Sequence, residues 1–174
     1  MILKLKRTPG LYLVGFMGCG KSTVGPLVAY ELGWRFLDVD QEIETEQRAG
    51  IPDIFSQRGE PEFRRIESEV LRSRVRQVQR GRPTVLALGG GAFAQANNYD
   101  LVEENGVTVW MECPLDVVRE RVGADPHRPL ARDPRLMGEL YEARREAYAK
   151  ADFRVDAGPD PKTVCQSILK LPIF

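Results

Sequence analysis

The sequence has little of what several common classes of protein require. It contains a single histidine, His127, and three cysteines, Cys19, Cys113 and Cys165, that lie far apart along the chain. One histidine cannot supply a zinc site built from several imidazoles, and it makes a Ser-His-Asp triad a poor hypothesis. An odd number of scattered cysteines offers neither a disulfide framework nor a Cys-x-x-Cys metal pair.

Long apolar runs and an excess of one charge are also missing. No apolar stretch reaches the roughly 20 residues that a membrane helix needs. The basic residues 1–7 are not followed by the apolar segment and cleavage site of a signal peptide. The 25 Lys and Arg residues equal the 25 Asp and Glu residues, whereas nucleic-acid binders usually carry a basic excess. We therefore expect a cytoplasmic protein with neither nucleic acid nor membrane as a partner.

Apolar residues make up 43% of the 174 residues, and this length suits one domain spanning residues 1–174. Short apolar runs alternate with amphipathic stretches, which predicts strands and helices in turn. The expected strands are 11–14, 35–39, 84–88, 107–111 and 153–155, and the expected helices include 21–32, one from Gln41, one after Pro61, 95–103, 114–121, 135–150 and one from Pro161. This alternation predicts an α/β fold with a parallel sheet covered by helices on both faces.

The segment from Gly15 to Ser22 matches the phosphate-binding pattern G-x-x-x-x-G-K-[ST]. Its glycines let several backbone N–H groups point at one anion, and the following helix adds the positive end of its dipole. Lys21 supplies a charge for the β- and γ-phosphates, and the Ser22 hydroxyl can bind Mg²⁺. A chance match is disfavoured because the motif follows an expected strand and opens an expected helix.

The third expected strand ends in Gly89, Gly90 and Gly91, so it offers no carboxylate to bind a metal ion or a substrate hydroxyl. Any such carboxylate must come from another part of the chain. Asp38 and Asp40 are the candidates, because residues two apart on a strand point the same way. The alternative is that Asp40 only caps a helix beginning at Gln41 and that Asp38 is a solvated strand end. The glycine run lets a ligand lie directly against the backbone, although it could also be a plain turn.

Most of the arginines are expected to be surface residues. One group of them fits the solvated face of a helix and its exit, and no function is assigned to it: Arg72, Arg74, Arg76, Arg80 and Arg82. Three others stand apart. Arg64 opens a helix, Arg128 lies in a proline-rich loop, and Arg144 precedes Tyr148 by one helical turn.

From about Leu11 to Asp156 the chain resembles the shikimate kinase family. The motifs that carry the resemblance, by their order and spacing, are the P-loop, Asp38-x-Asp40, Phe63-Arg64-Arg65, the glycine run and Arg128-Pro129-Leu130. The resemblance implies a small five-stranded parallel sheet like that of nucleoside monophosphate kinases. It also implies transfer of phosphate from ATP to the 3-hydroxyl of shikimate, a step toward chorismate and the aromatic amino acids.

The resemblance assigns the nucleotide side of the site. It implies that Asp38 holds the water shell of the Mg²⁺ ion that Ser22 can bind. It also implies that Arg121 lies beside the adenine and that Arg128 closes on the phosphates from a mobile lid over residues 122–134. Lys21, Asp40 and Arg128 are then the catalytic residues. The residues that it places around ATP are Gly15, Gly18, Cys19, Gly20, Lys21, Ser22, Thr23, Arg121 and Arg128.

The resemblance also assigns the acceptor side. Arg64 and Arg144 would grip the shikimate carboxylate, Asp40 would bind its hydroxyls, and Gly89, Gly90 and Gly91 would line the pocket. The expected partners are therefore shikimate and ATP, and we expect a monomer. Two other hypotheses stay open: a different small-metabolite kinase, such as a gluconate kinase, and a nucleotide-binding relative without catalysis.

Overall fold

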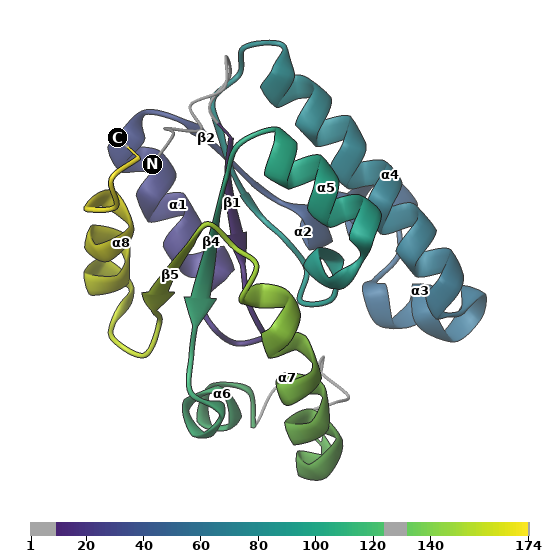
Figure 1. The fold of residues 1–174 in the computed structure, drawn as a ribbon. Helices are drawn as coiled ribbons and strands as arrows, with labels where there is room; N and C mark the ends of the chain where they lie inside the picture. Colours follow the sequence, from purple (N-terminus) through teal and green to yellow (C-terminus); the bar gives the residue numbers. More distant parts are fainter. Residues whose placement is uncertain (1–9, 124–131, 174) are drawn as a thin grey trace.

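The computed structural model describes residues 10–123 and 132–173, which form a five-stranded parallel sheet with helices on both faces (Figure 1). The strands are β1 (Gly10–Val14), β2 (Arg35–Asp38), β3 (Thr84–Ala87), β4 (Val107–Glu112) and β5 (Phe153–Asp156). They are arranged in the order β2-β3-β1-β4-β5, and every neighbouring pair is parallel. The predicted α/β class is confirmed.

Two layers of helix cover the sheet. The helices are α1 (Lys21–Leu32), α2 (Val39–Gln47), α3 (Ile51–Arg58), α4 (Glu60–Gln79), the 3-10 helix η1 (Ala92–Ala94), α5 (Ala96–Glu104), α6 (Leu115–Val122), α7 (Pro134–Tyr148) and α8 (Pro161–Leu169). α1 and α8 pack together on one face, and α4 and α5 lie on the other (Figure 1). The carboxyl ends of the strands point toward α6 and α7 (Figure 1).

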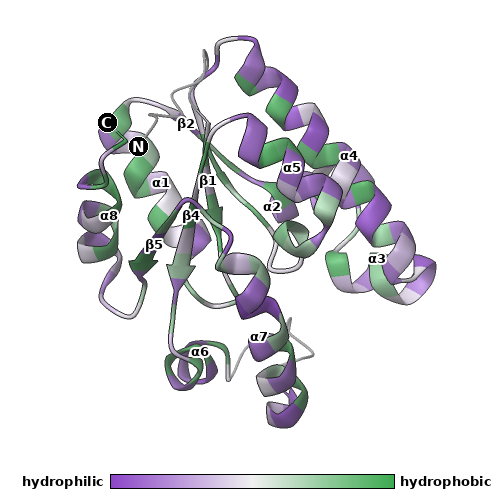
Figure 2. Ribbon diagram, viewed as in Figure 1, coloured by the Kyte–Doolittle hydropathy of each residue, from purple (hydrophilic) through white to green (hydrophobic). Residues whose placement is uncertain are grey.

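The core follows from where the apolar residues fall. The central strands β1 and β3 are buried at every residue, as expected for parallel strands covered on both sides. Along α4 the predicted apolar face is buried throughout: Phe63, Ile66, Val70, Val75 and Val78. Figure 2 shows that the strands are largely hydrophobic, whereas α4 also carries many hydrophilic residues.

The beginning of α2 differs from the prediction. β2 ends at Asp38, one residue early, and the helix begins at Val39 rather than Gln41. Asp38 caps the helix, since its Oδ1 accepts hydrogen bonds from the backbone N–H groups of Asp40 (3.0 Å) and Gln41 (3.4 Å). The extended backbone of Asp38 just before the first turn lets its short side chain reach these donors. The hypothesis that Asp40 is the cap is therefore wrong.

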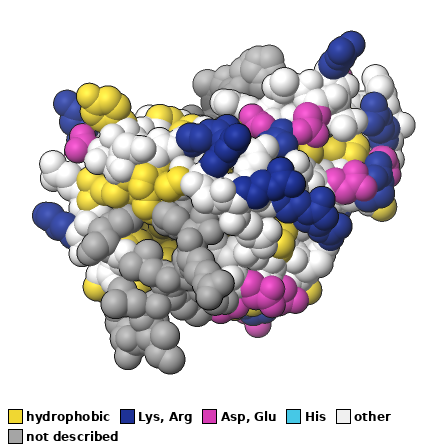
Figure 3. Space-filling view, turned by 90° about the horizontal axis from the view of Figure 1, so that it is seen from above, with side chains coloured by type: hydrophobic (Ala, Val, Ile, Leu, Met, Phe, Trp, Pro, Cys, Tyr) yellow, Lys and Arg dark blue, Asp and Glu magenta, His cyan; other side chains and the backbone are white. Residues whose placement is uncertain are grey.

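The surface reflects the balanced charge of the sequence. The face shown in Figure 3 carries basic and acidic side chains together with scattered apolar ones. Among residues 10–123 and 132–173, no helix combines the length and the apolar character that crossing a membrane requires.

One close backbone contact gives a test of this packing. A Cβ added at Gly106 would lie 2.2 Å from the backbone oxygen of Gly10 and 2.7 Å from Cε2 of Tyr12. Because a strand backbone cannot yield as a flexible side chain can, Gly106→Ala should lower the free energy of unfolding by about 1–3 kcal/mol. Urea denaturation of the two proteins measures this loss.

Gly138, inside α7, is the matched control. A Cβ there would meet only the ends of the Arg119 and Leu115 side chains, at 3.2 and 3.8 Å. Alanine favours a helix interior over glycine by about 1 kcal/mol, so Gly138→Ala should keep or raise stability. A Gly106→Ala protein as stable as the wild type would contradict the packing described for β1 and β4.

Candidate active site

The phosphate-binding loop lies between β1 and α1. Gly15, Gly18 and Gly20 have φ values of 149°, 74° and 97°, a region that side chains with a Cβ rarely occupy. A Cβ at Gly18 would also lie 2.4 Å from Cγ2 of Val122. No side chain caps the start of α1, so its positive end and its first N–H groups are offered to an anion.

Lys21 folds back over this loop. Its Nζ donates to the backbone oxygens of Gly15 (2.6 Å) and Phe16 (3.1 Å) and lies 3.6 Å from Sγ of Cys19. Cys19 is buried and fills the interior of the turn. The ammonium group is thus held at the centre of the loop, where a phosphate chain bound by the backbone would meet it.

Ser22 and Asp38 come together from α1 and β2. The Ser22 hydroxyl donates to Oδ2 of Asp38, while Oδ1 of Asp38 caps α2. One carboxylate therefore touches both the phosphate-binding helix and the helix that carries Asp40. Over the described parts of the chain, no group of three or more His, Cys, Asp and Glu side chains could hold a metal by itself.

Asp40 lies in the first turn of α2, and it lines the same cleft as Asp38. The sequence led us to expect both side chains on one side of a single strand, and this was wrong, because Asp38 ends β2 and Asp40 lies in α2. Burial and the nearby charge of Asp38 raise the pKa of Asp40, and Lys21 and Arg64 oppose this rise. A half-buried carboxylate with a raised pKa is a better proton acceptor than an exposed one.

The glycine run after β3 is surrounded by charged side chains. A Cβ on Gly89 would lie 2.7 Å from Oδ1 of Asp40, and one on Gly90 would lie 3.0 Å from Nη1 of Arg144. A Cβ on Gly91 would lie 2.4 Å from Nη2 of Arg64. The structure therefore brings Asp40, Arg64 and Arg144 together over this backbone, which has room for them only because it carries no side chains.

Glu67 belongs to this cluster, and the sequence analysis missed it. Its Oε2 accepts from Nη1 of Arg64 at 2.8 Å, and its side chain is only 1% exposed. Its Oε1 would lie 3.0 Å from a Cβ on Gly89, and within the described chain neither this oxygen nor Nε of Arg64 has a hydrogen-bond partner. Burial raises the pKa of Glu67, and Arg64 opposes the rise. Its position three residues after Arg64, on the same helical face, was the signal available in the sequence.

Arg144 approaches the cluster from α7. Its guanidinium group lies 5.8 Å from the centre of the Phe16 ring, and burial lowers its pKa. Tyr148, one turn later, donates its hydroxyl to the backbone oxygen of Gly90. Two arginines from different helices thus face one pocket, an arrangement suited to a carboxylate.

Arg121 joins the far side of the phosphate loop to the segment before α8. Its Nη1 bonds the backbone oxygens of Gly18 (3.4 Å) and Ala157 (3.2 Å), and its Nη2 bonds that of Gly158 (3.0 Å). Arg128 and the central part of the predicted lid, residues 124–131, lie outside the described residues. The lid and the role of Arg128 stay predictions.

A single cleft connects these groups. It has a volume of about 1740 Å³ and is lined by residues 17–23 of the phosphate loop and α1, by Asp38 and Asp40, and by the glycine run with its arginines. Pockets for one small ligand usually measure about 300–1,000 Å³. The cleft therefore has room for two substrates side by side.

Comparison with known families settles the relationship. A family model described as shikimate kinase matches residues 17–171. The chain belongs to the shikimate kinase family. The family implies that ATP is the co-substrate, in agreement with the phosphate loop.

Individual relatives agree with this family. The shikimate kinase of Persephonella marina (strain DSM 14350 / EX-H1) is 42% identical over 161 residues, which span 91% of this chain and 96% of that protein. The structure of a shikimate kinase from Acinetobacter baumannii in complex with shikimate matches with a TM-score of 0.87 at 35% identity, over 95% of this chain and 93% of that one. A gluconokinase from Sinorhizobium meliloti 1021 matches with a TM-score of 0.56 at 17% identity over 94% of this chain and 91% of that one, which shows a shared fold alone.

The pKa of Asp40 predicts how stability changes with pH. This pKa is raised in the folded protein, so protonated Asp40 makes its full contribution to the free energy of unfolding below the ordinary aspartate pKa of about 3.9. That contribution is lost as the pH rises through the raised pKa. Asp40→Asn cannot ionise. Its free energy of unfolding should therefore exceed that of the wild type at neutral pH, and the difference should vanish in acid.

Urea unfolding of both proteins across this pH range measures the difference. Asp100→Asn, at an exposed position of α5, is the control and should show no such gain. A neutral-pH stability of Asp40→Asn below that of the wild type would contradict the electrostatic environment described for Asp40.

Proposed function

We propose that this chain transfers the γ-phosphoryl group of ATP to the 3-hydroxyl of shikimate, giving shikimate 3-phosphate and ADP. The observation that carries the proposal is the convergence of Arg64, Arg144 and Asp40 on the glycine run, in the same cleft as the phosphate loop. Membership of the shikimate kinase family supports the choice of substrate.

The acceptor pocket suits a small ring with one carboxylate and several hydroxyls. The guanidinium groups of Arg64 and Arg144 would bind the carboxylate through charge-assisted hydrogen bonds. Asp40 would accept from the hydroxyls, and the backbone of Gly89–Gly91 would form the floor. Glu67 holds Arg64 through its 2.8 Å ion pair, so this guanidinium group is oriented before the substrate arrives.

The reaction needs positioning and neutralisation of charge more than a strong base, because the transition state of phosphoryl transfer is loose. The acceptor oxygen forms a bond to the γ-phosphorus, and the bond to the β,γ-bridging oxygen breaks. Asp40 orients the hydroxyl and, with its raised pKa, accepts the proton. Lys21 offsets the charge on the phosphates.

We infer that Mg²⁺ binds with the nucleotide and that the Ser22 hydroxyl and the Asp38 carboxylate would hold it. These two oxygens already touch each other at the edge of the phosphate loop, and Mg²⁺ takes few protein oxygens because it keeps waters and phosphate oxygens as ligands. When bound, the ion would neutralise part of the negative charge on the phosphates of the nucleotide. Since one chain supplies residues for both substrates, the site needs no second subunit, and we propose a monomer. We also propose a cytoplasmic location, which is consistent with membership of the shikimate kinase family.

The acceptor is tested by measuring ADP release with shikimate, gluconate and quinate in parallel. We expect turnover with shikimate to exceed turnover with either of the others, because the pocket pairs two arginines with a compact polar floor. Faster turnover with gluconate would identify the open-chain acid as the substrate. Nucleotide binding without ADP release on any of the three would favour a binding protein over an enzyme.

Arg64 is tested by substitution. Arg64→Ala should weaken shikimate binding by roughly ten- to a hundredfold, the cost of about 1.5–3 kcal/mol for a charge-assisted hydrogen bond. The affinity for ATP should stay unchanged, which titration calorimetry with each ligand can measure. Arg65→Ala is the control, because Arg65 is exposed and pairs only with Glu62 and Glu69 among the described residues. Equal shikimate affinities for Arg64→Ala and the wild type would remove Arg64 from the site.

A further inference from the structure

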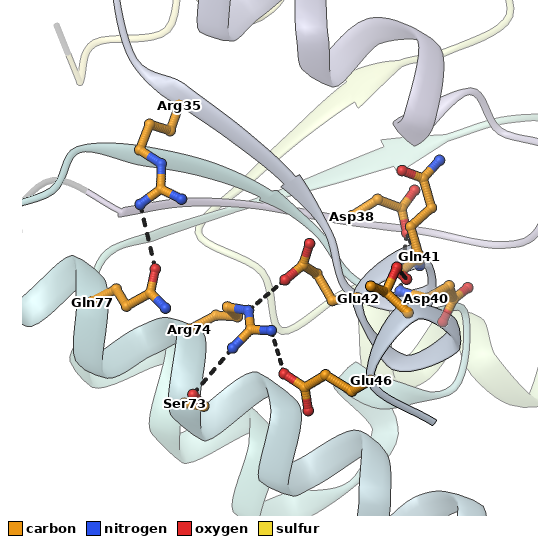
Figure 4. Close-up of polar contacts among 10 residues, drawn as sticks. Arg35, Asp38, Asp40, Gln41, Glu42, Glu46, Ser73, Arg74 and Gln77 are labelled. Atoms are coloured by element: carbon orange, nitrogen blue, oxygen red, sulfur yellow. Dashed lines mark hydrogen bonds and ion pairs between the residues drawn. The ribbon is translucent and has the colours of Figure 1, made fainter. Parts of the chain in front are cut away.

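A set of polar contacts, which we call the polar seam, joins α2 to α4. Arg74 of α4 points across to α2, where its Nε lies 2.6 Å from Oε2 of Glu42 and its Nη2 pairs with Glu46 (Figure 4). Arg35 of β2 extends the seam through a 3.3 Å hydrogen bond to Gln77 (Figure 4). The Arg74 side chain is only 13% exposed, so its assignment to a solvated helical face was wrong.

Both of the joined helices contribute side chains to the acceptor pocket. α2 carries Asp40, and α4 carries Arg64 and Glu67. Asp40 stands two residues before Glu42, within the turn that Arg74 holds. The distance between the hydroxyl-binding carboxylate and the carboxylate-binding arginine therefore depends on how α2 sits against α4.

Apolar packing alone fixes α2 poorly. The helix has nine residues, and only Val39 and Ile43 are buried. Apolar contacts are not directional, so two buried residues define the rotation of a short helix less sharply than directed bonds do. Glu42 and Glu46 are one helical turn apart and bind the same guanidinium group. Two directed bonds of this kind fix both the rotation and the axial position of the helix.

We propose that Arg74 is a positioning residue for the acceptor: it holds α2 against α4 so that Asp40 and Arg64 keep the separation that shikimate requires. The proposal rests on the proposed function for the identity of the acceptor. The nucleotide loop lies between β1 and α1, and the bond from Ser22 to Asp38 joins it to the capped end of α2. Loss of Arg74 should therefore act on the acceptor and leave ATP binding nearly unchanged.

Steady-state kinetics with shikimate and ATP test the proposal. Arg74→Ala should raise the KM for shikimate by about three- to tenfold, the loss expected for a partly buried charge network, while the KM for ATP changes little. Arg74→Lys keeps one charge and should restore part of the loss. Arg72→Ala, at an exposed position of the same helix, is the matched control and should behave like the wild type.

A double-mutant cycle separates positioning from general weakening of the fold. Glu42→Gln with Glu46→Gln should raise the KM for shikimate as Arg74→Ala does, and adding Arg74→Ala should then have little further effect. This pair also tests the proposal if Arg74→Ala does not fold.

Two outcomes would overturn the inference. The first is an unchanged KM for shikimate in Arg74→Ala, and the second is an equal increase in the KM values for shikimate and ATP. If Arg74→Ala does not fold, the same two outcomes are read from the variant with Glu42→Gln and Glu46→Gln. A wild-type protein that does not phosphorylate shikimate would instead contradict the proposed function, so the two failures can be told apart.

Discussion

The carboxylate of Asp38 is the contact on which both halves of the site depend. One of its oxygens accepts from the Ser22 hydroxyl at the start of the phosphate-binding helix, and the other caps α2. The residue that bonds to the start of the phosphate-binding helix therefore also determines where the helix bearing Asp40 begins. Asp38 is 8% exposed, and a carboxylate so buried is tolerated only because its oxygens are hydrogen-bonded. This one side chain therefore joins the phosphate loop to the helix that carries Asp40.

Beyond Asp38, hydrogen bonds and ion pairs hold the other residues of the site in place. Arg74 holds α2 to α4, Glu67 holds Arg64, and Tyr148 holds the backbone of Gly90 beside Arg144. Charges crowded in this way work against folding, as the raised pKa values of Asp40 and Glu67 indicate. The large apolar core on both faces of the sheet offsets that cost, so the protein can keep an arrangement suited to its ligands rather than to its own stability.

The sequence predicted those parts of the fold whose signals are local. The bounds of α1 were correct because a glycine loop precedes it and Gly33, with φ of 66°, ends it. The boundary between β2 and α2 was wrong because Asp38 and Asp40 can both cap a helix, and the choice depends on where the strand leaves the sheet. The bonds of Arg74 could not be predicted, since its spacing fits a solvated face until the position of α2 is known. Glu67 was missed because a glutamate near an arginine on a helix is usually an exposed ion pair.

The free oxygen of Glu67 has a consequence for inhibitor chemistry. Among the described residues, its Oε1 is buried without a hydrogen-bond donor, next to the floor formed by Gly89. A buried acceptor left unpaired costs about 1–3 kcal/mol. A synthetic ring compound that placed an amine or hydroxyl against this oxygen would recover that energy on binding. Such a compound could bind more tightly than a ligand of the same size that contacts only the two arginines and Asp40.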